Sequence, residues 1–136
     1  MSLVRDIMTK NVVTIESSKT VYDAAQLMAE KRLGALLVVI KGFPVGIITE
    51  KDIVHRVVAK RANVDARLSE TMTKTLITVE PETSIREAAR VMAKNKIHRL
   101  PVLKGNKLMG IVAASDFVRN AGKKTTTEEI LEALRR

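Results

Sequence analysis

The chain has 136 residues, which is enough for one compact domain with a hydrophobic core. Hydrophobic residues make up 46% of it and aromatic residues only 2%, so we expect a core of aliphatic side chains. Cysteine is absent, which excludes disulfides, thiolate metal sites and cysteine nucleophiles. The formal net charge of +9 favours anionic partners, although the basic residues are scattered as on an ordinary solvated surface.

The N-terminal residues contain no apolar run of the kind found in signal peptides. The longest apolar stretch, residues 34–40, is far shorter than the roughly 20 residues that a membrane-spanning helix needs. We therefore expect a soluble, cytoplasmic protein that does not contact a membrane.

The sequence contains an internal repeat with a spacing of 64 residues. At this shift Met-Thr-Lys at 8–10 aligns with Met-Thr-Lys at 72–74, and Asp52 aligns with Asp116. No gap is needed between residues 8 and 56. Such a repeat predicts one supersecondary unit used twice, with each copy too small to bury its apolar face alone. Packing of the two copies with pseudo-two-fold symmetry would create clefts between them.

Each copy is predicted to have the element order β-α-β-β-α. Thr20 begins the first helix, because Asp23 three residues later completes a capping pattern and the apolar residues that follow have helical spacing. In chain order, the first copy is predicted to contain a strand at 12–15, the helix from Thr20, a buried strand at 36–40, a turn at Lys41 and Gly42, a strand at 45–48 and a helix over 50–60.

The second copy shows the same signals. Ser84 and Glu87 predict a reciprocal capping box, and residues 104–107 predict the hairpin turn before a strand at 108–112. Gly122 is expected to end the last helix of this copy. Residues 61–69 are read as the connection between the copies.

The C-terminal segment has no counterpart in the repeat. Residues 125–129 form a helix start, and an apolar stripe of Ile130, Leu131 and Leu134 follows. This extra helix is expected either to fold back on the body or to pack on a second chain. The predicted organisation is an α+β fold with repeat 1 at 4–62, repeat 2 at 66–121 and a C-terminal helix at 125–136.

The first candidate for chemistry is the segment from Gly46 to Asp52, in which a strand runs into a helix. The simpler interpretation is that Thr49 caps the helix and Asp52 is its capping partner. The functional interpretation uses the same geometry, because a hydroxyl and a carboxylate that line a cleft can bind the hydroxyls of a ribose. The residues alone favour the simpler interpretation, a helix cap.

The second candidate is the segment 95–102, where His98 and Arg99 lie between a helix end and a buried strand. Arg99 could pair with a phosphate, or both residues could cover the helix C-terminus, where cations are favoured. The chain contains no P-loop, dinucleotide-binding glycine motif, metal-ligand cluster or nucleophile arrangement. We therefore expect no enzyme activity, no metal and no catalytic cofactor.

Together these features resemble tandem CBS domains, the cystathionine-β-synthase-type repeats that form a Bateman module. The resemblance rests on the ungapped repeat and on the Gly-hydrophobic-hydrophobic-Ser/Thr-x-x-Asp signature at residues 46–52. The segment 95–102 is similar to the phosphate-facing segment in the γ regulatory subunit of AMP-activated kinase. The resemblance covers residues 4 to about 120.

The resemblance implies two adenosine-binding clefts between the repeats. In the first cleft, residues of both copies would contact the ribose, the adenine and the phosphates. The ribose would bind to Thr49 and Asp52, the adenine would lie among Val13, Leu33, Gly34 and Ile47, and the phosphates would meet His98, Arg99 and Ser115.

The second cleft would be built around Asp116, with Ile77, Ile97 and Ile111 near the base. It departs from the family pattern at Ala113, where Ser or Thr is expected. Its phosphate side would draw on the uncharged Gly34 and Ala35, which leaves Lys51 as the candidate cation. We therefore expect unequal sites, with tighter binding at Asp52.

The leading hypothesis is a regulatory sensor of AMP, ADP or ATP that forms a homodimer and acts on an unidentified protein. One alternative keeps the module but binds S-adenosylmethionine or methylthioadenosine; a phosphate is favoured because Arg99 would repel a sulfonium. A second alternative is a basic nucleic-acid-binding protein, which the scarcity of aromatic residues disfavours. A third is a structural dimer whose clefts stay empty.

Overall fold

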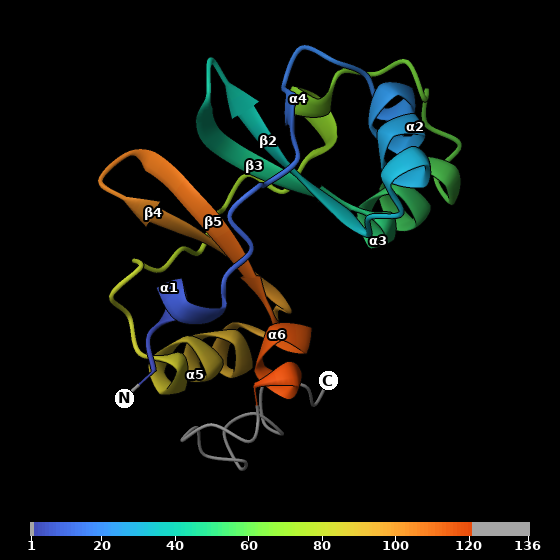
Figure 1. The fold of residues 1–136 in the computed structure, drawn as a ribbon. Coiled ribbons are helices and arrows are strands. Elements are labelled where there is room, and N and C mark those ends of the chain that lie inside the picture. Colours follow the sequence, from blue (N-terminus) through green and yellow to red (C-terminus); the bar gives the residue numbers. More distant parts are fainter. Residues whose placement is uncertain (1, 121–136) are drawn as a thin grey trace. The chain divides into compact units, whose positions relative to one another are not determined.

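A computed structural model describes residues 2–120, and the predicted helix at 125–136 and Gly122 lie outside the described residues. The chain divides into two compact units (Figure 1). The first-repeat unit is Val13–Leu76, and the second-repeat unit combines the described parts of Met1–Val12 and Ile77–Arg136. The sequence boundaries at 4–62 and 66–121 stay predictions, because these units are grouped by contacts in space.

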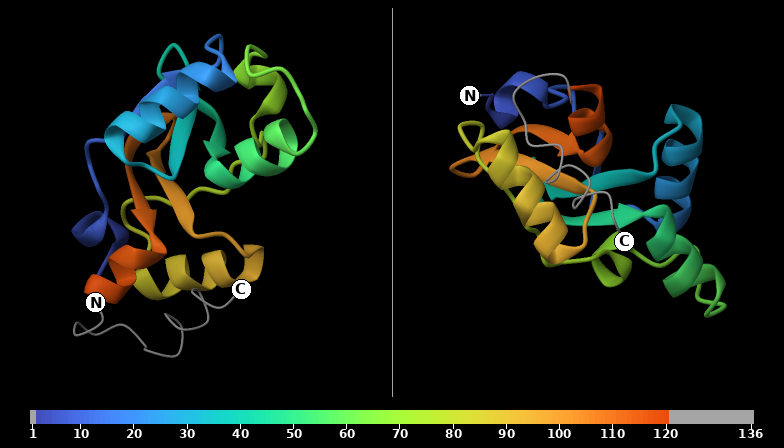
Figure 2. Two further views of the ribbon diagram at one scale, coloured as in Figure 1. Left: turned by 90° about the vertical axis from the view of Figure 1, so that its right-hand side faces the viewer. Right: turned by 90° about the horizontal axis from the view of Figure 1, so that it is seen from below.

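The first-repeat unit contains a three-stranded sheet in the order β1-β2-β3, in which β1 runs parallel to β2 and β2 antiparallel to β3. Two helices of this unit, α2 and α3, lie beside one another next to the sheet (Figure 2). The elements are β1 (Thr14–Glu16), α2 (Val21–Lys31), β2 (Ala35–Ile40), β3 (Phe43–Thr49), α3 (Glu50–Asp52), η1 (Ile53–Val58) and α4 (Leu68–Thr71).

In its described part, up to residue 120, the second-repeat unit contains the antiparallel hairpin β4-β5 and three helices. In place of an opening strand, a single parallel bridge joins Val79 to Val102. The α+β class and the order of elements in the repeats are thus confirmed, with this one strand reduced to a bridge. The elements are α1 (Val4–Ile7), α5 (Ile85–Asn95), β4 (Arg99–Lys104), β5 (Lys107–Ala113) and α6 (Ala114–Arg119).

The start of α2 has the predicted capping box. The Thr20 hydroxyl accepts from the Asp23 N–H at 3.0 Å, and the Asp23 carboxylate accepts from the Thr20 N–H at 3.1 Å. The hydrogen bond from the Thr20 backbone is the main cause that lowers the pKa of Asp23, and the hydrogen bond with the Thr20 side chain lowers it further. Because the folded pKa is the lower one, this stabilisation is present above the unfolded pKa and is lost as the pH falls through the folded value.

Only one of the two hydrogen bonds of the capping box predicted at the start of α5 is formed. Ser84 Oγ accepts from the Glu87 N–H at 3.0 Å. The Glu87 carboxylate instead forms an ion pair with Arg90 at 2.8 Å. The prediction of a reciprocal box was therefore wrong, because a cation one turn later competes for the carboxylate.

The helix predicted over 50–60 begins as α3 but continues as the π-helical segment η1, which ends at Val58. The Ala59 N–H donates to the Val54 carbonyl at 2.9 Å, five residues back. This wider turn buries Val57 completely and leaves Val54 and Val58 exposed.

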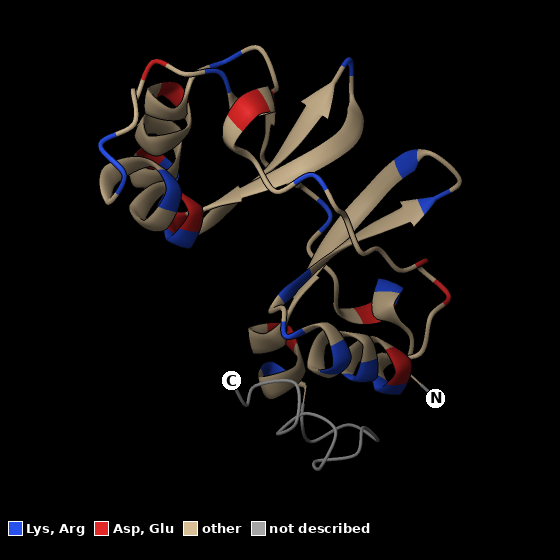
Figure 3. Ribbon diagram, turned by 180° about the vertical axis from the view of Figure 1, so that it is seen from behind, with Lys and Arg blue, Asp and Glu red and all other residues tan. Residues whose placement is uncertain are grey.

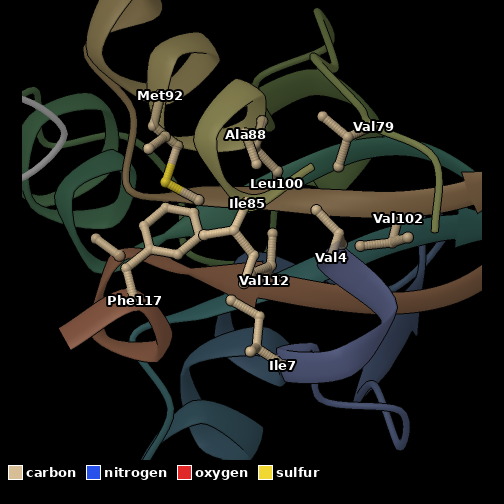
Figure 4. Packing of buried hydrophobic residues seen from close by; sticks show 12 residues of the cluster. Val4, Ile7, Val79, Ile85, Ala88, Met92, Leu100, Val102, Val112 and Phe117 are labelled. Carbon is tan, nitrogen blue, oxygen red and sulfur yellow. The ribbon is translucent and has the colours of Figure 1, made fainter. Parts of the chain in front are cut away.

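Each unit has its own hydrophobic core, built almost entirely from aliphatic side chains as predicted. In the second-repeat unit, Phe117 is the one aromatic ring of the buried cluster and packs with Met92 and Leu100 (Figure 4). Val4 and Ile7 from the N-terminal segment belong to the same cluster. A segment far away in the sequence therefore completes this core.

The two repeats exchange their leading segments. The N-terminal segment forms backbone hydrogen bonds between Thr9 and Ile111 at 2.8 and 3.0 Å, so it pairs with β5 of the second repeat. The segment that leads into the second repeat pairs with β3 of the first, through bonds between Thr73 and Ile47 at 3.0 and 2.9 Å. The Met-Thr-Lys motif of each copy thus packs on the strand of the other.

A glycine on each strand permits this close approach. A Cβ built on Gly46 would lie 2.6 Å from Met72 Sδ and 2.9 Å from the Thr73 carbonyl oxygen. A Cβ on Gly110 would lie 2.7 Å from the Thr9 carbonyl oxygen and 2.8 Å from Met8 Sδ. At both glycines these distances are too short for any side chain larger than hydrogen.

Gly46→Ala is expected to lower the free energy of unfolding by about 1–3 kcal/mol, because the added methyl must displace Met72 and the Thr73 backbone. Urea unfolding of Gly46→Ala, Met72→Ala and the double variant forms a mutant cycle. The double variant should lose less than the sum of the two single losses. Strictly additive losses would contradict the contact.

Candidate ligand-binding site

The turn from β3 into α3 brings Thr49 and Asp52 together as the sequence predicts. The Thr49 hydroxyl oxygen accepts from the Asp52 N–H at 3.1 Å. Asp52 Oδ2 accepts from the Thr49 N–H at 3.0 Å and from the Thr49 hydroxyl at 3.1 Å. The helix cap therefore occupies one of the two carboxylate oxygens.

The other oxygen, Asp52 Oδ1, has two longer contacts. Thr73 Oγ1 donates to it at 3.4 Å, and Arg56 Nε lies 3.7 Å away. Hydrogen bonds to a carboxylate are usually about 2.5–2.9 Å. The Asp52 side chain is 13% exposed. The Asp52 side chain is thus partly accessible, and the present partners of Oδ1 are held loosely.

The equivalent residue of the second repeat, Asp116, has different surroundings. Its Oδ2 accepts from the Ala113 N–H at 2.7 Å, and Ala113 has no hydroxyl to add. Arg119 forms an ion pair with Oδ1. The Asp116 side chain is 6% exposed, and the Arg119 side chain is 63% exposed. This carboxylate is therefore more covered and more fully paired than that of Asp52.

The three residues predicted to face phosphates lie at one end of the β4-β5 hairpin. The His98 carbonyl accepts from the Ala114 N–H at 2.8 Å, and Arg99 lies opposite Ala113 in the strand register. Ser115 follows in the first turn of α6. The second-repeat unit thus brings His98, Arg99 and Ser115 to one edge.

The same place in the first-repeat unit carries no cation on its strand. Gly34 accepts from the Glu50 N–H at 3.0 Å, and Ala35 pairs with Thr49. Lys51, in the first turn of α3, is exposed. The two edges thus differ in charge, and their roles toward phosphates stay predictions.

The residues predicted to line the two base pockets are all partly buried. Val13 and Leu33 pack against the core of the first-repeat unit, and Ile77 and Ile97 pack against that of the second. Ile47 and Ile111 are the strand residues that pair with Thr73 and Thr9. Each predicted cleft draws on both units, and the meeting of Asp52 with Arg99 stays a prediction.

A hollow of about 570 Å³ lies wholly within the first-repeat unit, between α2 and the α3-η1 helix. Its lining is mostly apolar, with one cation and one acid. It is lined by Ala25, Met28, Ala29, Arg32, Leu33, Gly34, Glu50, Ile53 and Val54. Two of these, Leu33 and Gly34, are among the residues predicted for the adenine.

Sequence reasoning missed three residues that contact the two carboxylates. Arg56 and Arg119 are four and three residues after their aspartates, a helical spacing that could have indicated them. Thr73 is distant in sequence from Asp52, and only the exchange of leading segments brings it there.

Within residues 2–120, no group of three or more His, Asp or Glu side chains is arranged to hold a metal ion. In the same part of the chain, every helix is too short or too polar to cross a membrane.

Comparison with known proteins identifies related chains. The family model described as "CBS domain" matches residues 4–59 and 68–123. The CBS domain-containing protein YhcV of Bacillus subtilis (strain 168) is 38% identical over 120 residues, which are 88% of this chain and 86% of that protein.

Solved structures of CBS proteins are similar to the whole described fold. The CBS domain pair of protein MJ0100, solved in complex with 5′-methylthioadenosine and S-adenosyl-L-methionine, is 30% identical at a TM-score of 0.82, with 92% of this chain and 99% of that chain covered. A hexameric CBS-CP12 protein from bloom-forming cyanobacteria is 40% identical at a TM-score of 0.78, with coverage of 91% and 68%.

Arg119→Met should lower the free energy of unfolding by about 1–3 kcal/mol, because it leaves the buried Asp116 carboxylate without its cation. Chemical denaturation measures the loss. Adding Asp116→Asn removes the unpaired charge and should recover part of the lost free energy of unfolding. A single variant as stable as wild type would show that the ion pair does not stabilise the fold.

Proposed function

The chain belongs to the CBS-domain family, and from that premise we propose that it is a regulatory module that binds an adenine nucleotide, AMP, ADP or ATP, and is not an enzyme. The observation that carries the proposal is the Asp52 carboxylate, which is partly exposed and whose Oδ1 has only long contacts, at 3.4 and 3.7 Å. A carboxylate in this state suits the two adjacent hydroxyls of a ribose, which both donate hydrogen bonds.

The related MJ0100 domain pair supports an adenosine ligand, since both of its ligands contain adenosine. For this chain we favour a phosphate-bearing ligand over a sulfonium. Arg99 and His98 stand at one edge of the second-repeat unit with Ser115, and the net charge of the chain is +9. An anionic ligand gains from such surroundings and a sulfonium does not.

Binding at the two predicted sites is proposed to be unequal. Asp116 already has an ion pair with Arg119 and lacks the neighbouring hydroxyl. A ligand there would have to displace this guanidinium from a buried carboxylate, at an energetic cost that Asp52 does not impose. The Asp52 site is therefore proposed to fill first.

Nucleic acid is a weaker candidate. Figure 3 shows Lys and Arg interspersed with Asp and Glu on both units. Single-stranded nucleic acids are bound by basic grooves with stacking aromatic rings, and aromatic residues are 2% of this chain.

We also propose that the chain forms a homodimer through the face of α2 and η1. Tyr22, Val54 and Val58 are large hydrophobic residues that are exposed on these helices, and Val54 also lines the hollow. Arg32 and Glu50 at its rim supply one charge of each sign, which permits reciprocal pairs between two copies related by a two-fold axis.

AMP should raise the melting temperature of the wild-type chain, because a ligand that binds only the folded state adds stability of about 2.7 kcal/mol at 100 times its Kd. Asp52→Ala should abolish this shift. Asp23→Ala is the matched control, since it removes the same kind of capping aspartate from α2 and should leave the shift unchanged.

Parallel samples with S-adenosylmethionine and methylthioadenosine separate the ligand classes. A larger shift with these than with AMP would replace the nucleotide proposal with the sulfonium or thioether alternative. A wild-type chain that responds to none of these ligands, nor to ADP or ATP, would be a structural module with empty clefts.

Val54→Asp should convert a dimer to a monomer by placing a charge in the proposed apolar interface, as measured by light scattering after gel filtration. Phe43→Asp is the control, because Phe43 is equally exposed but lies at the tip of the β2-β3 hairpin. A monomeric wild type, or a dimeric Val54→Asp variant, would contradict this interface.

A further inference from the structure

We propose that Arg56 and Thr73 couple the ligand site at Asp52 to the segment at residues 71–76, so that a ligand on Asp52 loosens this segment. The proposal rests on the proposed function and adds a means of regulation to the same site. The segment ends at Leu76, where the first-repeat unit gives way to the second along the chain.

The coupling begins at a single oxygen atom, Asp52 Oδ1. It accepts from the Thr73 hydroxyl at 3.4 Å, which is one direct contact with the segment. It also lies 3.7 Å from Arg56 Nε. Since the helix cap occupies Oδ2, new donors from a ligand compete for Oδ1 with these two side chains.

Arg56 provides the second contact. One of its terminal nitrogens, Nη1, donates to the Thr71 carbonyl oxygen at 3.2 Å and lies 3.5 Å from the Met72 carbonyl oxygen. The guanidinium thus bridges the Asp52 carboxylate and the backbone just before Thr73. Its side chain is 53% exposed, so it is free to move when the carboxylate is taken.

The remaining contacts define how far the segment can loosen. Leu68 is fully buried in the core, so the start of α4 is anchored independently of Asp52. Beyond it, Thr73 is held by its two backbone bonds with Ile47 and by its hydroxyl contact with Asp52, and Arg56 holds the backbone just before it. Loss of the side-chain contacts should therefore increase opening of the Thr73–Ile47 pair while α4 stays packed.

The second repeat has no equivalent arrangement at the aligned positions. Asn120 occupies the position of Arg56, and its side-chain amide donates to the Asp116 backbone carbonyl at 2.7 Å. The Asp116 carboxylate pairs with Arg119 of its own helix. Coupling from an aspartate to a leading segment is therefore specific to the first repeat.

Because coupling between two sites is reciprocal, a looser segment must also favour the ligand. Arg56→Met removes the competitor for Oδ1 and should tighten AMP binding about fivefold, at the low end of common coupling factors. Lys60→Met is the matched control, since it removes one exposed positive charge shortly after the same helix. Thr73→Val is a second variant of nearly unchanged shape.

The experiment combines AMP titration by calorimetry with amide hydrogen exchange of the full chain. AMP should speed exchange of the Thr73 amide in wild type. Arg56→Met and Thr73→Val should speed it without AMP and bind AMP more tightly, whereas Lys60→Met should match wild type in exchange and bind no more tightly.

Two results overturn the coupling. In the first, wild type binds AMP but exchange of its Thr73 amide is unchanged or slower. In the second, the Arg56→Met and Thr73→Val variants gain no affinity for AMP. Either result would remove this inference alone and leave the proposed function standing. Wild type that binds none of AMP, ADP and ATP would remove both proposals.

Discussion

The Met-Thr-Lys segments are held against the hairpin strands by paired backbone hydrogen bonds and by the absence of a side chain at one strand position. Gly46 and Gly110 let Met72 and Met8 approach the strands at distances that no Cβ would permit. Because each segment precedes one repeat and pairs with the other, neither copy completes its core without the chain of its neighbour. This arrangement also carries the Thr73 hydroxyl to the Asp52 carboxylate, so the same packing serves the fold and the candidate site.

The two copies have kept this framework and diverged at their carboxylates. Asp52 has a threonine hydroxyl beside it and an arginine four residues later, and its Oδ1 is held loosely. Asp116 lacks the hydroxyl and forms an ion pair with an arginine three residues later. The framework sets where each carboxylate lies, at the junction of a strand and a helix. Nearby side chains then decide whether that carboxylate stabilises the fold or remains open to other donors.

Local signals in the sequence predicted the elements well where all interacting residues are neighbours in the chain. The Thr20–Asp23 and Thr49–Asp52 caps formed as expected, because each requires only residues three apart. In the predicted hairpin turn, Gly42 adopts a positive φ, which glycine permits, and Lys41 beside it also has a positive φ. The full cap at Ser84 was not obtained, since Arg90 competes for Glu87, and the π-helical form of η1 left no sign in the sequence pattern.

The sequence by itself determined the duplication, the mixed class of each copy, the core composition and the identity of the candidate carboxylates. These follow from spacing and from the chemistry of residues close together in the chain. Only the tertiary structure decided that the leading segments are exchanged, that Thr73 reaches Asp52, and that Asp116 is the more covered of the two carboxylates. The physical reason is that these contacts depend on which distant segment fills the space beside a strand. The two Met-Thr-Lys motifs are identical, so the sequence does not indicate which strand each of them pairs with.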